Sequence, residues 1–476
     1  MGEIDTDYLV VGAGASGMAF TDALVAESDV DAVLVDRRHR PGGHWLDAYP
    51  FVRLHQPSAN YGVTSTVLGA DRIDDSGPNA GFYERATAAE ICDYFARVLE
   101  GDLASSGRVR FLGMSDYRGE DADGHHVVSS LTGADTTIRV RRKLVDATYV
   151  ESSIPSRHTP SFAVDPEVRM IPPNDLVDLG EVPKGFTVIG GGKTAMDTCN
   201  WLLDAGVDAD DIGWIRPRDP WLFNRAFMQP LELVGSYMQL QARWVEAAAE
   251  AEDGADFGRR LEAHDVFVRI DADVEPEVFR GATISKLEIG ALRSIERVVR
   301  NGKILRVDPK RVVFADGEIA ADPGVLYVDC TAAGVRPTTL RPIFEPDKIT
   351  VQYVTIGIVP WSAATIGAVE ASRDDDVDKN RLCPPATFTG NISDVLQLSH
   401  AGMTGVLMRA ADPDVGAWNA RCRLDPARGA ADRIDDPRVA AAFASLAANL
   451  GPAMEKLSRW AGEPRTPEPA ERIPSG

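Results

Sequence analysis

Cysteine is scarce in this chain of 476 residues, and the five cysteines that occur are scattered. None belongs to a Cys-x-x-Cys pair, which argues against an enzyme that works through a redox-active disulfide. The sequence also lacks a run of histidine, cysteine and carboxylate residues with the spacing of a metal site, because His125 and His126 stand apart from other ligands. We therefore expect free thiols and no bound metal.

The chain has no excess of positive charge, since 50 Lys and Arg residues face 72 Asp and Glu residues, for a net charge of −22. Nucleic acids and anionic membranes attract basic surfaces, so we expect neither as a partner. Residues 1–7 lack the basic and apolar parts of a secretion signal, which predicts a cytoplasmic protein. The uncharged stretch from Ile349 to Val369 is interrupted by Pro360, and we expect a strand, a turn and the start of a helix there instead of a membrane span.

Two glycine motifs typical of dinucleotide binding are present, far apart in the chain. The loop residues of the first motif are Gly12, Gly14, Ser16 and Gly17. They follow the apolar run Tyr8–Val11, and their glycines permit a tight turn and close approach of the backbone to a pyrophosphate at a helix N-terminus. The next apolar run, Ala32–Val35, ends in Asp36, roughly 20 residues beyond the motif, where a carboxylate can accept hydrogen bonds from a ribose.

The second motif differs in the charge that follows it. Its loop residues are Gly190, Gly192, Lys193, Thr194 and Ala195, with alanine in place of the third glycine. Lys193 and Thr194 are candidates to contact a pyrophosphate or a 2′-phosphate. The next apolar run, Ile212–Ile215, ends in Arg216, and Arg218 follows. Arginine forms charge-assisted contacts with phosphate, so this site is expected to prefer NADPH.

The segment after Asp36 resembles the class B flavoprotein monooxygenases, the flavin-containing and Baeyer–Villiger enzymes. In that family an acid is followed by basic residues and by Gly-Gly-x-Trp, and the corresponding residues here are Arg37, Gly43, His44 and Trp45. The stretch Tyr49–Ser58 is similar to the one that runs past the flavin. The resemblance implies that FAD occupies the first site.

The resemblance implies an α/β fold with two Rossmann-like dinucleotide-binding domains, the NADP domain being inserted in the FAD domain, with helical additions. The expected parts are residues 1–181 for the FAD domain, 182–324 for the NADP domain with a helical insert at about 219–290, 325–460 for the rest of the FAD domain and a C-terminal helical region, and 461–476 for a disordered, proline-rich tail. Met114 ends a strand that resembles the one meeting the adenine. Ala333 and Gly334 end the strand that is expected to return to the FAD domain.

The reaction implied by the resemblance is oxygen insertion into an unidentified small molecule. NADPH would reduce FAD, and reduced FAD would react with O2 to form a C4a-(hydro)peroxyflavin that oxygenates the substrate. His55 stands where the family has Asp or Asn on the flavin-facing strand, and it could donate a hydrogen bond or act as acid or base. Gln56 could hold the flavin edge or the nicotinamide amide. Both are therefore candidate catalytic residues.

The chain departs from the family in one fingerprint. The stretch Ile154–Phe162 keeps a histidine and a following aromatic residue but lacks the leading Phe-x-Gly.

Three other functions stay open: an NADPH-dependent FAD oxidase or reductase without oxygen insertion, an N-hydroxylating monooxygenase, and a flavoprotein that serves as a redox-responsive binding partner. The C-terminal helices would pack over the flavin or form a contact between subunits of a homo-oligomer.

Overall fold

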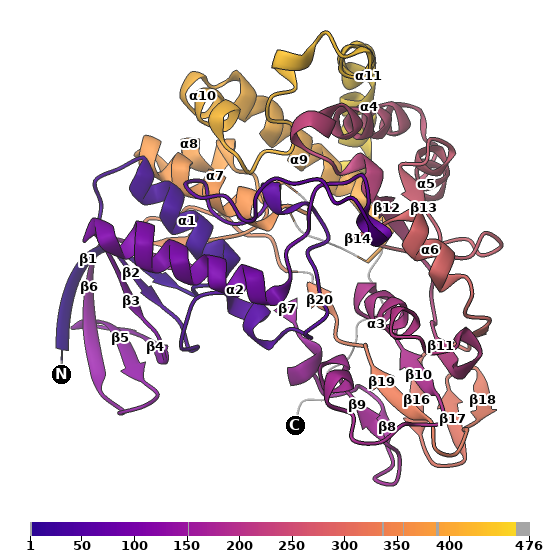
Figure 1. Ribbon diagram of the computed structural model, residues 1–476. Coiled ribbons are helices and arrows are strands. Elements are labelled where there is room, and N and C mark those ends of the chain that lie inside the picture. Colours follow the sequence, from indigo (N-terminus) through magenta and orange to yellow (C-terminus); the bar gives the residue numbers. More distant parts are fainter. Residues whose placement is uncertain (1, 151, 336–337, 356, 387–389, 463–476) are drawn as a thin grey trace.

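The computed structural model of the protein describes residues 2–150, 152–335, 338–355, 357–386 and 390–462. The described residues form two large sheets with their helices, three smaller sheets, and a group of helices at the top of the view (Figure 1). The predicted tail, residues 461–476, lies outside the described residues except for its first two positions, which belong to the end of the last helix and the residue after it.

The first sheet carries the first glycine motif. Its strands, in spatial order, are β3 (Val109–Leu112), β2 (Ala32–Val35), β1 (Gly2–Val11), β6 (Asp135–Asp146), β5 (Gly124–Ser129) and β4 (Ser115–Asp121), with β21 (Lys348–Thr350) also beside β6. β1, β2, β3, β6 and β21 run parallel, whereas β5 pairs antiparallel with β4 and β6. The carboxyl ends of the parallel strands share one edge of a sheet, which is where open α/β sheets bind their ligands.

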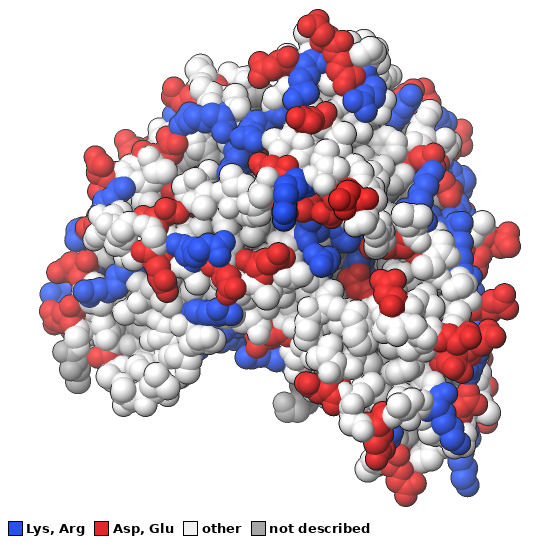
Figure 2. Space-filling view, in the orientation of Figure 1, with Lys and Arg blue, Asp and Glu red and all other residues white. Residues whose placement is uncertain are grey.

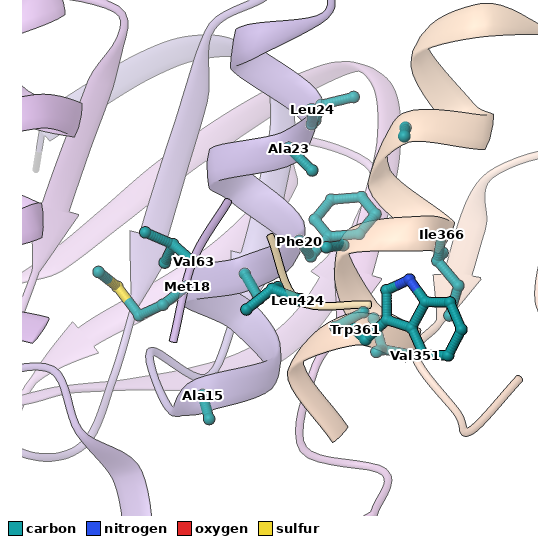
Figure 3. Close-up of a cluster of buried hydrophobic side chains, with 14 of the residues drawn as sticks. Ala15, Met18, Phe20, Ala23, Leu24, Val63, Val351, Trp361, Ile366 and Leu424 are labelled. Carbon is teal, nitrogen blue, oxygen red and sulfur yellow. The ribbon is translucent and has the colours of Figure 1, made fainter. Parts of the chain in front are cut away.

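Helix α1 (Ala15–Ala26) packs against α7 (Val359–Ser372), which returns to this domain from the far end of the chain. Figure 3 shows Phe20 and Leu24 of α1 beside α7, with Ile366 on the facing helix. The two helices approach so closely that a Cβ added at Gly367 would lie 2.5 Å from the carbonyl oxygen of Phe20. Burial against both the sheet and α7 explains why α1 is apolar around most of its circumference.

The second sheet is entirely parallel and carries the second glycine motif. Its order is β15 (Arg297–Val299), β11 (Ile212–Ile215), β10 (Phe186–Ile189), β19 (Leu326–Asp329) and β9 (Met170–Ile171). All of these strands lie in sequence between β6 and β21 of the first sheet. The predicted fold class, with one dinucleotide-binding domain inserted in another, is thereby confirmed.

The boundaries of the inserted domain differ from the predicted ones at 182 and 325. β9 joins the second sheet before residue 182, and β19, expected to return to the first sheet, instead pairs with β10 and β9. The first strand to return is β21, which pairs with β6. An apolar run such as Leu326–Asp329 is suited to the interior of either parallel sheet, so its sequence alone does not decide the partner.

The insert after β11 mixes strands with helices. It comprises β12 (Pro220–Asn224), α4 (Val234–Glu250), α5 (Gly254–Ala263), β13 (Phe267–Val268), β14 (Val278–Ile284) and α6 (Lys286–Leu292). Smaller pairings join β16 (Ile304–Val307) to β17 (Arg311–Phe314) and to β8 (Ala163–Val164), β17 to β18 (Gly317–Ala320), and β20 (Gly334–Val335) to β7 (Ser152–Ser153).

The remaining helices are α2 (Ala88–Arg97), α3 (Lys193–Asp204), α8 (Asp376–Leu382), α9 (Ile392–Ala411), α10 (Pro413–Arg421) and α11 (Pro437–Ala461). α11 packs along α4 and against α9 at the top of Figure 1, so the insert and the C-terminal region form one helical layer. No helix in the described ranges has the length and apolarity to span a membrane. Acidic and basic side chains are mixed over the face shown in Figure 2.

Candidate active site

A cavity of about 1020 Å³ begins at the first glycine motif and continues under the helical layer. This volume is at the upper end of the roughly 300–1,000 Å³ range of ligand pockets, so it has room for a large cofactor. Most residues predicted for FAD and for catalysis line it: Gly12, Gly14, Ser16, Asp36, Arg37, Gly43, His44, Trp45, His55 and Gln56. The fold therefore brings together residues that are up to 44 positions apart in sequence.

Gly14 and Gly43, which both line the cavity, come together by close backbone approach. Gly43 has φ +59°, and a Cβ built on it would lie 2.8 Å from the Cα of Gly14. A Cβ on Gly17 would fall 1.8 Å from the carbonyl oxygen of Gly12, which holds α1 tightly against the loop. Gly17 thus serves helix packing and does not itself line the cavity.

Asp36 lies at the carboxyl end of β2 with its carboxylate turned toward the glycine loop. One carboxylate oxygen accepts a hydrogen bond of 2.7 Å from the Ala13 N–H, and the other accepts one of 2.8 Å from the Arg38 N–H. Each oxygen keeps a further lone pair. Beyond Asp36, Trp45 donates a 2.6 Å hydrogen bond to the Tyr61 hydroxyl, which fixes the indole in the cavity wall.

His44 and His55 both face surroundings that disfavour their protonated forms. Burial, reinforced by the charge of Lys193, lowers the pKa of His55 to about 3. Burial and the nearby Arg38 lower the pKa of His44 to about 4. His55 is consequently a neutral imidazole near pH 7, a form with one N–H donor and one nitrogen acceptor. Gln56 donates a 3.1 Å hydrogen bond to the Asn60 carbonyl.

A buried cluster of charges lies near His55 and connects the insert to the first domain. Glu288 on α6 contacts Arg225 at 2.6 Å and Arg85 at 3.6 Å, and all three side chains are at most 8% exposed. Burial raises the pKa of Glu288, but the positive charges of Lys193, Arg225 and Arg85 outweigh it and bring the pKa to about 2. Thr283 of β14 completes the contact by donating a 2.6 Å hydrogen bond to the His55 carbonyl.

The second glycine motif opens α3, and this helix meets the first domain on one face. Lys193 pairs with Asp197, whose carboxylate accepts a 2.8 Å hydrogen bond from the Tyr49 hydroxyl. One turn further, Trp201 stacks on Phe51 with ring centroids 4.7 Å apart. Lys193, Asp197 and Trp201 share a face because they are four residues apart. The two dinucleotide motifs are therefore coupled through the segment that contains His55.

The second glycine loop turns tightly and leaves the start of α3 open. Gly190 has φ +139°, and a Cβ there would lie 2.6 Å from the Cys330 carbonyl oxygen. A Cβ on Gly192 would meet no atom within 4 Å, so the N-terminus of α3 is open on that side. Ala195 is fully buried where the motif often has its third glycine, and Thr194 follows Lys193 in the first turn.

Arg216 does not occupy the position expected of it. Its guanidinium stacks 4.4 Å above the ring of Trp214 and lies 3.0 Å from Asp219, and its side chain is 2% exposed. A buried, paired arginine is not placed to receive a 2′-phosphate, which corrects that prediction. Arg218 is exposed at the same edge of the sheet, and its carbonyl oxygen would lie 2.8 Å from a Cβ on Gly191.

Three further predicted contacts lie beside the cavity without lining it. Met114 adopts φ +51°, and the residues that follow it, Ser115 to Tyr117, line the cavity in its place. Ala333 and Gly334 precede Val335, which does line it. Each expected position is thus displaced by one or more residues along the chain.

The apolar part of the cavity was not predicted from the sequence. α4 contributes Tyr237, Met238, Leu240, Gln241, Trp244 and Val245, and α9 contributes Val395, Ser399, Gly402, Met403, Val406 and Leu407. Their spacing of three and four residues is that of one helix face, so the helical period was a signal that could have found them. Which faces enclose the cavity depends on the packing of α4 beside α9 and α11.

Comparisons with known proteins agree with this architecture. A family model described as an NAD(P)-binding Rossmann-like domain matches residues 10–72, which include the first glycine motif. The chain is 42% identical over 423 residues to the Uncharacterized protein Rv2000 of Mycobacterium tuberculosis (strain ATCC 25618 / H37Rv), and the match covers 89% of this chain and 78% of that protein. The Uncharacterized protein Mb2023 of Mycobacterium bovis matches to the same extent.

Among solved structures, cyclohexanone-bound cyclohexanone monooxygenase in the Rotated conformation has a TM-score of 0.50 and 13% sequence identity. The match covers 78% of this chain and 86% of that chain. At such low identity the likeness concerns the fold, and it agrees with the resemblance seen in the sequence.

Proposed function

We propose that this chain, which belongs to the family of the mycobacterial protein Rv2000 and has the fold seen in cyclohexanone monooxygenase, is an FAD- and NADPH-dependent monooxygenase. When bound, FAD would accept a hydride from NADPH and activate O2, so that one oxygen atom enters a small-molecule substrate and the other leaves as water. The residues of the chain would bind the two cofactors, exclude water and orient the substrate.

The residues around the first glycine motif fit FAD. A Cβ at Gly43 would lie 2.8 Å from the Cα of Gly14, so the loop has no room for side chains there and its bare backbone suits the close approach of a pyrophosphate. Asp36 lies at the strand end with lone pairs available to a ribose. The cavity continues from this loop past His44 and Trp45 toward His55, as an extended dinucleotide requires.

The second site fits NADPH on the residues expected from the sequence, except for Arg216, which is buried. The open N-terminus of α3 at Gly192 would hold the pyrophosphate. We assign the 2′-phosphate to Arg218, because it is exposed at the edge where Arg216 is buried. Lys193 lies within the loop, and its contact with Asp197 joins this site to the Tyr49 segment of the first domain.

His55 and Gln56 would orient the reacting groups. Because the His55 imidazole is neutral, it would act through one N–H donor and one nitrogen acceptor and would not supply a proton from an imidazolium. The charge cluster around Glu288 would hold this segment in place through Thr283 and α6. His55 and Gln56 line the same cavity as the first glycine motif and the apolar residues of α4 and α9.

The observation that carries the proposal is that one cavity joins the first glycine motif to an apolar chamber, with His55 and Gln56 on its wall. Exclusion of water from such a chamber favours transfer of oxygen to a substrate over loss of hydrogen peroxide. The test is NADPH oxidation by the yellow protein under ¹⁸O-labelled O2 with a panel of substrates. Label in an organic product and falling peroxide yield are expected.

The same experiment separates the other functions. Oxidation of NADPH that yields only peroxide or reduced acceptor, with no label in any product, would replace oxygen insertion with an oxidase or reductase. Label that appears only with amines would identify an N-hydroxylating enzyme. Flavin that NADPH does not reduce would refute the enzymatic proposal.

A further inference from the structure

We propose that the chamber between α4, α9 and α11 binds an uncharged, lipophilic ring compound that carries one hydroxyl group, and that Tyr237 and Gln241 hold this hydroxyl. The inference rests on the proposed function, because it names the substrate class of the same cavity. It concerns equilibrium binding, however, and can be tested without NADPH or turnover.

The body of the chamber is apolar because helices turn their apolar faces toward it. Along α9 the lining residues before Arg409 and Ala410 are Val395, Ser399, Gly402, Met403, Val406 and Leu407. Leu446 and Leu450 of α11 are four residues apart and add to the same wall. Such a surface gains free energy by removing apolar ligand surface from water.

One wall of the chamber is aromatic. Phe223 and Trp244 stack with centroids 6.0 Å apart, and Phe279 meets Phe223 edge-on at 5.4 Å. All three line the cavity, and Phe257 and Phe267 support Trp244 from behind. A wall of ring faces and edges suits a ligand ring, because aromatic pairs are favoured in stacked and edge-on arrangements.

Tyr237 and Gln241 supply the polar side chains that would hydrogen-bond to the ligand in this chamber. They are four residues apart on α4, so their side chains share one face, and the Gln241 amide hydrogen-bonds to the Tyr237 phenol. Burial, with the negative charge of Asp425, raises the pKa of Tyr237 well above its usual value. The phenol therefore stays neutral and can both donate to and accept from a ligand hydroxyl.

The charged groups of the cavity wall favour a neutral ligand. Asp425 already accepts 2.8 Å hydrogen bonds from the Asn419 amide and the Ala427 N–H. Arg409 donates a 2.9 Å hydrogen bond to the Leu382 carbonyl. Burial raises the pKa of Asp425 and lowers the pKa of Arg409, so the environment disfavours charge of either sign. A ligand anion would share this penalty.

The experiment measures binding of three naphthalene probes to the FAD-loaded protein by isothermal titration calorimetry. The probes are 2-naphthol, 2-methylnaphthalene and 2-naphthoate, which share the ring but differ in the polar group. We expect one 2-naphthol per chain, with roughly three- to tenfold higher affinity than 2-methylnaphthalene, the value of about one neutral hydrogen bond. 2-Naphthoate is expected to bind more weakly than both.

Variants locate the site. Tyr237→Phe should reduce the preference for 2-naphthol over 2-methylnaphthalene to within about twofold, and Gln241→Leu should act in the same direction. Gly402 lines the chamber and has no atom within 4 Å of an added Cβ, so Gly402→Phe should fill the chamber and abolish binding of the ring compounds. Gly290→Phe is the matched control, since Gly290 is a helical glycine with equal space on the exposed surface of α6.

The inference is wrong if 2-naphthoate binds best, if 2-methylnaphthalene equals 2-naphthol, or if Gly402→Phe binds the probes as the wild type does. Failure of the proposed function has a different signature. In that case 2-naphthol binds and responds to Tyr237→Phe, while no substrate receives labelled oxygen.

Discussion

The assignment of the 2′-phosphate to Arg218 instead of Arg216 leads to a pair of variants with opposite outcomes. Arg218 is exposed beside the second glycine loop, so Arg218→Ala removes a phosphate contact without disturbing the core. A charge-assisted hydrogen bond contributes about 1.5–3 kcal/mol, which corresponds to a roughly ten- to hundredfold weaker affinity for NADP⁺. Affinity for NAD⁺ should change little, because it lacks that phosphate.

Arg216→Ala should instead lower the stability of the fold. The substitution removes the stacking on Trp214 and the 3.0 Å contact with Asp219. Asp219 would keep a partner, since Arg300 donates a 2.9 Å hydrogen bond to it, so the carboxylate is not left bare. We therefore expect a loss of about 2–4 kcal/mol in the free energy of unfolding, below the upper range for breaking a buried pair.

Calorimetric titration of the FAD-loaded variants with NADP⁺ and NAD⁺ measures the first effect, and urea unfolding measures the second. Arg218→Lys, which keeps the charge, is the control and should retain most of the preference for NADP⁺. The reasoning would be refuted if Arg216→Ala selectively weakened NADP⁺ binding while its free energy of unfolding stayed at the wild-type value.

Three other predictions follow from the site. Glu288→Gln should lower the free energy of unfolding in urea by about 3–5 kcal/mol, because it leaves buried arginines without a counter-charge, and an unchanged midpoint would contradict this. The pKa of His55 is about 3 in the folded protein against 6.5 for the free side chain, so its contribution to stability is present above pH 6.5 and is lost as the pH falls toward 3. The Tm of wild type should therefore fall relative to that of His55→Asn between pH 6.5 and 4.5, and a constant difference would show that His55 does not titrate in this way. Gly43→Ala should lower flavin absorbance per chain, because its Cβ would lie 2.8 Å from the Gly14 Cα, whereas Gly81→Ala, also at positive φ but in open space, should retain flavin.

The sequence predicted those parts of the site that depend on neighbouring residues. A glycine loop between a buried strand and a helix has one geometry wherever it occurs, so Gly12, Gly14 and Asp36 were found from their spacing, and the structure places all three on the cavity. The two parallel sheets followed from the same apolar runs, and their strands confirm the predicted fold class.

The predictions that failed depended on side-chain and strand pairing, which is decided in the folded chain. Arg216 was expected to contact a 2′-phosphate because it follows a strand. Its guanidinium instead stacks on Trp214 and pairs with Asp219, which also accepts a hydrogen bond from Arg300. The strand Leu326–Asp329 was expected in the first sheet, and its backbone pairs with β10 instead. The pattern of neighbouring residues in the sequence determines neither the direction of a side chain nor the pairing of a strand.

By itself the sequence determined the two nucleotide loops, because a glycine's backbone freedom and the alternation of buried strand and helix act over a few residues. Only the tertiary structure decided the apolar chamber and the charge state of His55. The chamber needs α4, α9 and α11 side by side, although more than 140 positions separate the first from the second. The pKa of His55 falls because its side chain is buried and because the charge of Lys193, from the other domain, acts on it. Burial and electrostatics act through space, so they are defined only when the chain has folded.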